Sequence, residues 1–334
     1  MTNSPHKPKL LKVLLLIVVL VAWGCENDEY PAPEGPPVKL SLAVSPATYS
    51  GLIAIADDKG YFKDAGLDLS MDLYPSGREA LEAVCRGEAQ AATVADISFS
   101  AKALEEPSIR VLASISTTVG SRIVARKDRN IQSPSDLRGK KVGFSTGTVS
   151  DYFLYAFLMT ENIPPSDITA VDIPPARQVE SVVNGELDAV SAFEVFAFEA
   201  EKRLGENAVS WDSQNNLAYH WLLATKASLI RSPEPLKRLF RGLLRAEGFA
   251  QTHEEETRTI LVRKWNLDPA FVLESWPRTR LSVSLGQSVV TSLENYARWQ
   301  MVKEGKLEDS TDVLNYLDTG ILDEMAPKEV TIFR

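Results

Sequence analysis

The chain has 334 residues, and its 45 Asp and Glu outnumber its 36 Lys and Arg, which gives a formal net charge of −9. This acidity excludes binding to nucleic acid or to an anionic membrane surface by charge alone. The length allows two lobes of ordinary size, each with a core. Two cysteines and three histidines are too few for a Cys/His metal cluster, so we expect no metal, no cofactor and no disulfide.

Residues 1–24 have the pattern of a secretory signal. Three lysines precede an unbroken apolar run, Val13–Ala22, which is too short to span a bilayer as a finished helix. Cys25 follows directly, as in the lipobox of bacterial lipoproteins, although Ala22 and Trp23 replace the residues usual before that cysteine. We expect lipidation at Cys25. Ordinary secretion and an uncleaved anchor ending at Trp23 are the alternatives.

Residues 25–37 carry four prolines and four acids, which predicts a solvated tether. Removal of residues 1–24 takes away three lysines and no acid, so the mature charge is −12. We therefore expect an exported protein, lipid-anchored in the cell envelope on the periplasmic side of a membrane or on the outer face of the cell membrane.

From residue 38 strands and helices alternate. The pattern predicts a strand over 39–44, a helix over 51–59 closed by Gly60, and a strand over 67–73. A helix around 80–85, closed by Gly87, and a strand over 89–94 follow. This order is typical of an α/β fold, in which helices cover a sheet.

A second copy of this pattern follows. Ser45-Pro-Ala-Thr-Tyr-Ser50 is echoed one hundred positions on by Ser145-Thr-Gly-Thr-Val-Ser150, and residues 82–96 match 180–194 with five identities. The match predicts two similar lobes, with chance composition as the alternative. We place lobe 1 at 38–122 and 223–334 and lobe 2 at 123–222.

Short apolar strands at 122–126 and 221–225 are the expected crossings between the lobes. From about Pro233 the apolar residues recur at helical spacing, which predicts a helical remainder packed on lobe 1.

Polar side chains follow the predicted strands where ligands bind to open α/β sheets, outside the carboxyl ends. The two Ser-x-x-Thr-x-Ser turns offer hydroxyls and free backbone N–H groups, although plain helix capping explains them as well. Asp96 and Glu194 lie at matching places in the two copies. They are helix caps, an acid–base pair or ligand acceptors.

Two other side chains have functional and structural interpretations. Cys85 lies on the apolar face of a predicted helix, where a packing role is favoured over a nucleophile. His220 lies at a lobe crossing and is either structural or exposed to the cleft.

The chain resembles the type II periplasmic solute-binding proteins of ABC importers, in the branch for sulfonates, nitrate and thiamine-precursor pyrimidines. The resemblance is carried by Gly51-Leu-Ile-Ala-Ile-Ala-Asp-Asp-Lys-Gly-Tyr-Phe-Lys-Asp-Ala-Gly-Leu-Asp-Leu, by Val84-Cys-Arg-Gly-Glu-Ala-Gln-Ala-Ala, by Leu137-Arg-Gly-Lys-Lys-Val-Gly and by Gly185-Glu-Leu-Asp-Ala-Val. It implies a two-lobed α/β fold that captures a small solute between its lobes. It also implies delivery to an ABC permease with its ATPase. We expect a monomer that is not an enzyme, because export and the scarcity of cysteine and histidine argue against the cytosolic enzymes that share this architecture.

The same resemblance places ligand contacts at 46–49, 93–96, 117–121, 147–151 and 193–194. With the serines of the two turns, the candidate ligand-binding residues are Ser45, Thr48, Tyr49, Thr93, Asp96, Thr117, Thr118, Ser145, Thr148, Asp151, Phe193 and Glu194.

Two departures from the family pattern concern the ligand. Phe193 stands where the family often has Trp, which removes an indole, and Asp151 would repel an anion. An anionic ligand would need compensation from Arg78, Arg122 or Arg177. A tethered sensor for a signalling partner and an enzyme of thiamine or menaquinone precursor synthesis are the alternative functions.

Overall fold

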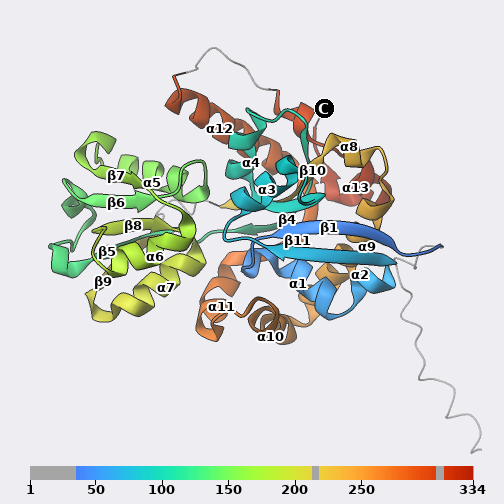
Figure 1. Cartoon of the computed structure of the whole chain (residues 1–334), viewed down its shortest axis with the longest axis horizontal. Coiled ribbons are helices and arrows are strands. Elements are labelled where there is room, and N and C mark those ends of the chain that lie inside the picture. The colour runs from blue at the N-terminus through green and yellow to red at the C-terminus, as the bar shows by residue number, and fades with distance from the viewer. Residues whose placement is uncertain (1–34, 213–217, 306–311, 334) are drawn as a thin grey trace, which may run out of the picture. The chain divides into compact units, whose positions relative to one another are not determined.

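The computed structural model describes residues 35–212, 218–305 and 312–333 (Figure 1). The predicted signal, Cys25 and most of the predicted tether lie outside these residues. In the described ranges, none of the helices has both the length and the apolar character that a membrane crossing needs. At the end of the predicted tether, the Pro36 carbonyl accepts a hydrogen bond from Arg238 at 2.9 Å.

The larger sheet has seven strands in the spatial order β12-β11-β4-β10-β3-β1-β2. They are β1 (Val38–Val44), β2 (Leu67–Leu73), β3 (Ala91–Ala95), β4 (Ile109–Thr118), β10 (Tyr219–Lys226), β11 (Thr279–Gly286) and β12 (Val330–Thr331). β1 runs parallel to β2 and β3, whereas β10 is antiparallel to β3 and β4. We call the part built around this sheet the first lobe.

The smaller sheet has five strands in the order β7-β6-β8-β5-β9. They are β5 (Arg122–Arg126), β6 (Lys141–Phe144), β7 (Thr169–Asp172), β8 (Ala189–Ala192) and β9 (Ala208–Asp212). β6 is parallel to β7 and β8, and β5 is antiparallel to β8 and β9. We call the part built around this sheet the second lobe.

The two sheets repeat one arrangement, as the sequence predicts. In each, a parallel trio at one edge of the sheet (β2-β1-β3 or β7-β6-β8) is followed by an antiparallel strand. Leu42 pairs with Ala91 in the first lobe, and Val142 pairs with Ala189 in the second. Leu42 and Val142 are 100 positions apart, and Ala91 and Ala189 are 98 positions apart. These are the two offsets of the sequence repeat. The predicted fold class, two similar α/β lobes, is confirmed.

Thirteen α-helices surround the sheets in the described residues. They are α1 (Gly51–Asp58), α2 (Tyr61–Asp64), α3 (Gly77–Arg86), α4 (Asp96–Ala103), α5 (Val149–Thr160), α6 (Pro175–Val183), α7 (Glu194–Leu204), α8 (Ala227–Ile230), α9 (Glu234–Thr252), α10 (Glu254–Trp265), α11 (Pro269–Ser275), α12 (Gln287–Lys303) and α13 (Gly320–Met325). The predicted C-terminal helices pack on the first lobe, with α9 and α10 against α1 and with α12 against α4.

Helices cover both faces of the smaller sheet. Successive residues of a strand point to opposite faces, so neighbouring residues of β5 pack against different helices. Ile123 of β5 packs with Phe153 and Phe157 of α5, whereas the next residue, Val124, packs with Val182 of α6 on the other face. Gly87 ends α3 with a φ of 79°, a left-handed conformation that favours glycine, as its position in the sequence predicts.

The expectation that the chain is helical from Pro233 onward is wrong at β11. In this strand Leu281, Val283 and Leu285 are buried in alternation, because their side chains face one side of the sheet beside β4. β5 and β10 cover the predicted crossing strands. The chain leaves the larger sheet after Thr118 and re-enters it at Tyr219. The lobe boundaries at 122/123 and 222/223 stay a prediction.

Candidate binding cleft

Loops that follow parallel strands in both lobes meet at a small pocket, which we call the inner pocket. Its volume is about 10 Å³, enough for a group the size of one water molecule. The first lobe contributes side chains after β1 and β3, and the second lobe contributes side chains after β6 and β8. The lining residues are Tyr49, Ser76, Gly77, Arg78, Ala95, Ser98, Thr148, Val149, Phe193, Tyr219 and Trp221.

A larger hollow, the outer chamber, adjoins the inner pocket. Its volume is about 410 Å³, and it also lies between the lobes. Ser76, Arg78 and Thr148 line both spaces, which therefore lie side by side, and we refer to the two together as the cleft. The remaining lining is mostly polar or proline: Pro75, Glu79, Glu82, Ser145, Thr146, Asp172, Ile173, Pro174, Pro175 and Ala176.

A third space, the hinge pocket, lies where the chain passes from β4 to β5. It is also about 10 Å³ in volume, and it shares Val149 and Tyr219 with the inner pocket. Its other lining residues are Ile97, Val119, Gly120, Ser121, Tyr152, Phe153 and Tyr296.

Glu194, at the start of α7, lies between the inner pocket and the hinge pocket. It follows Phe193, which lines the first, and it contacts Gly120, which lines the second. Its Oε1 accepts a hydrogen bond from the Tyr219 hydroxyl of β10. Burial raises the pKa of Glu194 above its usual range. Burial, with Glu194 nearby, also raises the pKa of Tyr219.

Among the residues that the structure describes, three buried polar atoms around this region have no hydrogen-bond partner. They are Oε2 of Glu194, Nε1 of Trp221 and Oγ of Ser121. Glu194 and Trp221 are each only 4% exposed. Buried polar groups are nearly always paired in folded proteins. Trp221 lines the inner pocket and Ser121 lines the hinge pocket, so a ligand in these spaces is a candidate partner for them.

Asp96 has its partners within the first lobe. Its carboxylate accepts hydrogen bonds from the backbone N–H of His220 and Ile97, each at 2.8 Å, and from the Ser292 hydroxyl. Burial raises its pKa to about 7. Asp96 and Glu194 are thus held by different groups. The cap interpretation is wrong for both acids in the described residues, because each is the first residue of its helix and neither helix has a side-chain cap hydrogen bond.

The two Ser-x-x-Thr-x-Ser turns hold their own loops closed. Ser50 donates to the Ser45 carbonyl at 2.7 Å, and Thr148 donates to the Ser145 carbonyl at 2.7 Å. Neither following helix receives a side-chain cap hydrogen bond from the turn. Thr148 also lines the cleft, whereas the Thr48 hydroxyl lies 3.3 Å from that of Thr279.

Four other predicted residues lie against the larger sheet or the outer chamber. Thr93 Oγ1 accepts from the Ser45 N–H at 3.4 Å. Thr117 lies near His220, and Thr118 contacts the Thr279 hydroxyl at 3.1 Å. Ser145 lines the outer chamber and donates to the Ile173 carbonyl at 2.6 Å.

Asp151 is paired across the two lobes. Its Oδ2 accepts from Lys303 Nζ of α12 at 2.6 Å and from the Gly147 N–H at 2.9 Å. The expected repulsion of an anion by Asp151 is therefore weakened, because Lys303 neutralises its charge.

Burial lowers the pKa of His220, which favours a neutral ring near Ser114.

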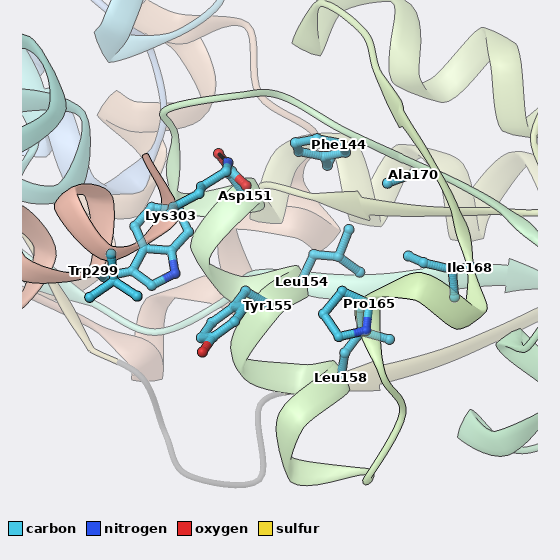
Figure 2. Close-up of a pocket in the computed structure, with 11 residues that line it drawn as sticks. Phe144, Asp151, Leu154, Tyr155, Leu158, Pro165, Ile168, Ala170, Trp299 and Lys303 are labelled. Atoms are coloured by element: carbon cyan, nitrogen blue, oxygen red, sulfur yellow. Dashed lines mark hydrogen bonds and ion pairs between the residues drawn. The ribbon is translucent and has the colours of Figure 1, made fainter. Parts of the chain in front are cut away.

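An apolar pocket of about 320 Å³, the side pocket, lies next to this ion pair. Figure 2 shows Trp299 and Lys303 on one side and Leu154, Tyr155 and Leu158 of α5 on the other. Lys303 Nζ lies 5.1 Å from the centroid of the Trp299 ring. The side pocket therefore combines residues of α12 with residues of the second lobe.

The three arginines proposed to compensate an anion have different positions. Arg122 donates to Glu201, Asp212 and Glu274, one carboxylate for each of its nitrogens. Arg177 is exposed and faces Glu186. Only Arg78 of these three lines the cleft, and it donates to Glu82 and to the Thr146 carbonyl.

Sequence reasoning missed several residues that line the inner pocket, among them the aromatic Tyr219 and Trp221. Trp221 brings an indole from the first lobe, and its ring centroid lies 4.0 Å from that of Tyr49. The available signal was the aromatic alternation Tyr219-His-Trp221, which leads into the predicted crossing strand over 221–225. For Cys85, burial raises the thiol pKa, which disfavours the nucleophile interpretation.

Comparison with known proteins gives one family and one fold. A family model described as NMT1/THI5 like matches residues 47–257, more than half of the chain. A Brucella abortus (strain 2308) protein, named only as a binding protein, is 21% identical over 229 residues, covering 66% of this chain and 69% of that protein.

Solved structures share the fold at low sequence identity. The alkanesulfonate-binding protein SsuA from Xanthomonas axonopodis pv. citri, bound to MOPS, aligns with a TM-score of 0.74 and 16% identity, over 86% of this chain and 100% of that one. Escherichia coli SsuA, a periplasmic aliphatic sulphonate binding protein, aligns at 0.68 and 15%, over 85% and 92%. The desulfurization enzyme DSZB aligns at 0.65 and 16%, over 86% and 99%. The fold thus serves binding proteins and at least one enzyme.

Proposed function

The chain belongs to the NMT1/THI5-like family, and from this premise we propose that it is the solute-binding protein of an ABC importer. It captures a small organic solute between its lobes and presents the closed form to a membrane permease, which works with an ATPase. The ligand class of the family branch, sulfonates, nitrate and pyrimidines, is the starting range for its solute.

One observation carries this proposal. The inner pocket is completed only by side chains from both lobes, with Tyr49 and Trp221 from the first and Thr148 and Phe193 from the second. A solute that contacts both walls stabilises the closed state over the open one, because these contacts exist together only when the lobes are closed. The permease then distinguishes loaded from empty protein by shape.

The connection between the lobes suits this motion. Only Val119, Gly120 and Ser121 separate β4 from β5, and short connections of this kind act as hinges. Arg122 follows directly, and its carboxylate partners come from both lobes: Glu201 and Asp212 from the second, and Glu274 of α11 from beside the first. We expect these ion pairs to rearrange when the lobes open.

The cellular location of the protein is part of the proposal. Export by the N-terminal signal, lipidation of Cys25 and a monomeric state would keep the protein near its permease between captures. Twelve tether residues at roughly 3 Å each allow a reach of about 35 to 40 Å.

The proposal is tested by binding and closure. Full-length protein is incubated with a small-molecule extract, washed, and denatured so that any bound compound is released for mass spectrometry. The captured compound should raise the melting temperature and reduce the radius of gyration in small-angle X-ray scattering. Saturable binding without compaction would refute capture between the lobes.

The similarity to DSZB favours one second candidate, an enzyme on the same fold. Recovery of the captured compound unchanged after prolonged incubation supports the binding protein. Its conversion to a product, at a rate proportional to protein concentration, would establish the enzyme instead.

A further inference from the structure

The side pocket is separate from the cleft. Among the residues that the structure describes, none lines both the side pocket and the inner pocket, the outer chamber or the hinge pocket. Its volume of about 320 Å³ lies in the range of sites that bind small organic molecules. An apolar cavity of about 150 Å³ accepts benzene, so the side pocket has room for two fused rings.

The floor of the side pocket is apolar and belongs to the core of the second lobe. Leu154 and Leu158 lie one helical turn apart on α5 and are buried in that core. Phe144 and Ile168, which also line the pocket, pack against the same core. A ligand that enters the pocket therefore rests on side chains whose positions are fixed by core packing.

Aromatic side chains from both lobes border the pocket. The centroid of the Trp299 ring of α12 lies 5.2 Å from that of Tyr152 and 6.1 Å from that of Tyr155, both of α5. Tyr155 is 40% exposed and Trp299 is half-buried, so both retain ring surface that a ligand can cover. Aromatic rings pack favourably in tilted and edge-to-face pairs at such distances. A further ring can therefore join this group.

The charges of the lining cancel one another. Of the lining residues that the structure describes, Asp151 and Lys303 carry charge, and they form an ion pair at 2.6 Å. Lys303 Nζ also lies 5.1 Å from the centroid of the Trp299 ring and 5.7 Å from that of Phe144, which stabilises the cation where it is. A charged ligand would have to compete with one member of this pair for the other. The pocket therefore favours a neutral ligand.

We propose that the side pocket binds a neutral aromatic molecule of two fused rings, and that this molecule holds the lobes together. Trp299, Val302 and Lys303 belong to α12, which packs against α4 of the first lobe, whereas the floor belongs to the second lobe. Because the two walls meet only while the lobes are closed, the bound molecule stabilises the closed state. The site goes beyond the proposed function, and only its effect on closure rests on that function.

Matched probes test the site on the full-length protein by calorimetry. 2-Naphthol is the neutral two-ring probe. Naphthalene-2-sulfonate and 2-naphthylmethylamine add a negative and a positive charge to the same rings, and 1-octanol is neutral but has no ring. 2-Naphthol should bind saturably and at least tenfold more tightly than the other three. It should also reduce the radius of gyration of the solute-free protein in small-angle X-ray scattering.

One variant of each wall and one control separate binding from folding. Ala170 and Thr169 are neighbouring exposed residues of β7, and of the two only Ala170 lines the pocket, because successive strand residues face opposite sides. Ala170→Phe fills the end of the pocket opposite Trp299 (Figure 2) and should weaken 2-naphthol binding at least tenfold. Thr169→Phe should have no effect. Trp299→Ala removes a ring from the other wall and should weaken binding and abolish the compaction. Melting temperatures without probe confirm that each variant is folded.

The outcomes distinguish this site from the proposed function. Absence of saturable 2-naphthol binding, tighter binding of a charged probe or of 1-octanol, or equal affinity in Ala170→Phe and Thr169→Phe would overturn the assignment. Binding with an unchanged radius of gyration would overturn the role in holding the lobes together. A solute from the extract that still binds and compacts the protein would then leave the proposed function intact. If no such solute binds while the 2-naphthol results are as expected, the proposed function fails and the site stands.

Discussion

Gly120→Ala is expected to disturb closure of the lobes more than folding. A Cβ at this position would overlap Cγ of Glu194 and would lie 2.9 Å from Oε1 and 3.0 Å from Cδ, closer than carbon atoms approach in proteins. Glu194 must therefore move, and its hydrogen bond with Tyr219 would break. Because Gly120 lies in the connection between the two sheets and Glu194 in the second lobe, we expect opening at this connection to relieve the overlap.

The magnitude follows from the crowding. An extra methyl group in a well-packed site costs about 1 to 3 kcal/mol. If the closed state bears this cost, affinity for the captured solute falls roughly 5- to 150-fold, since about 1.4 kcal/mol corresponds to a factor of ten. The ligand-free protein should remain folded and show a larger radius of gyration than the wild type.

The assay combines calorimetry, scattering and a double-mutant cycle. Gly248→Ala is the control, because a Cβ there meets no atom within 4 Å. It should leave affinity and radius unchanged. In a Glu194→Ala background the overlap disappears, so Gly120→Ala should then cost much less. A loss of the same size in both backgrounds, or an affinity equal to that of Gly248→Ala, would refute the reasoning.

Three further predictions concern other residues. Burial raises the pKa of Asp96 from 3.8 to about 7, so its contribution to stability is complete below pH 3.8 and is lost as the pH rises through 7. The free energy of unfolding should fall over this window by up to about 1.4 kcal/mol per pH unit. In Asp96→Asn, the free energy of unfolding, measured by urea denaturation at each pH, should depend less on pH. An unchanged pH dependence would contradict the raised pKa of Asp96. Lys303→Met breaks the ion pair with Asp151 and should weaken solute affinity about fivefold, with recovery in the double variant Lys303→Met and Asp151→Asn. If solute affinity does not recover in the double variant, Lys303 does not act on closure through its ion pair with Asp151. Cys25→Ser should move the protein from the membrane fraction to the soluble fraction, and unchanged fractionation argues against lipidation.

Several elements could be predicted from local patterns. The strand over 67–73 and the helix that Gly87 closes follow from alternation, helical spacing and a glycine in a left-handed cap. The strand over 279–286 carries the same alternating signal, with Leu281, Val283 and Leu285 buried. It was missed because the stretches on either side show helical periodicity.

The candidate site was predictable only as a region. Thr148 and Phe193 line the inner pocket as expected. Thr48 instead contacts Thr279, and Asp151 pairs with Lys303, 152 positions away. No local pattern signals such a partner, because the energy of a hydrogen bond or an ion pair depends on distance in space and on burial.

The sequence by itself determined the alternation of strands and helices at the start of the first lobe and the duplication of the lobe, since periodicity and turn residues act over a few positions. It also located the strand ends where polar side chains gather. Only the tertiary structure decided which of these side chains are satisfied and which remain open to a ligand. The sequence named Glu194 as a candidate because it matches Asp96 in the repeat. Only folding buried it beside Tyr219 and Gly120 and, among the described residues, left one of its oxygens without a partner.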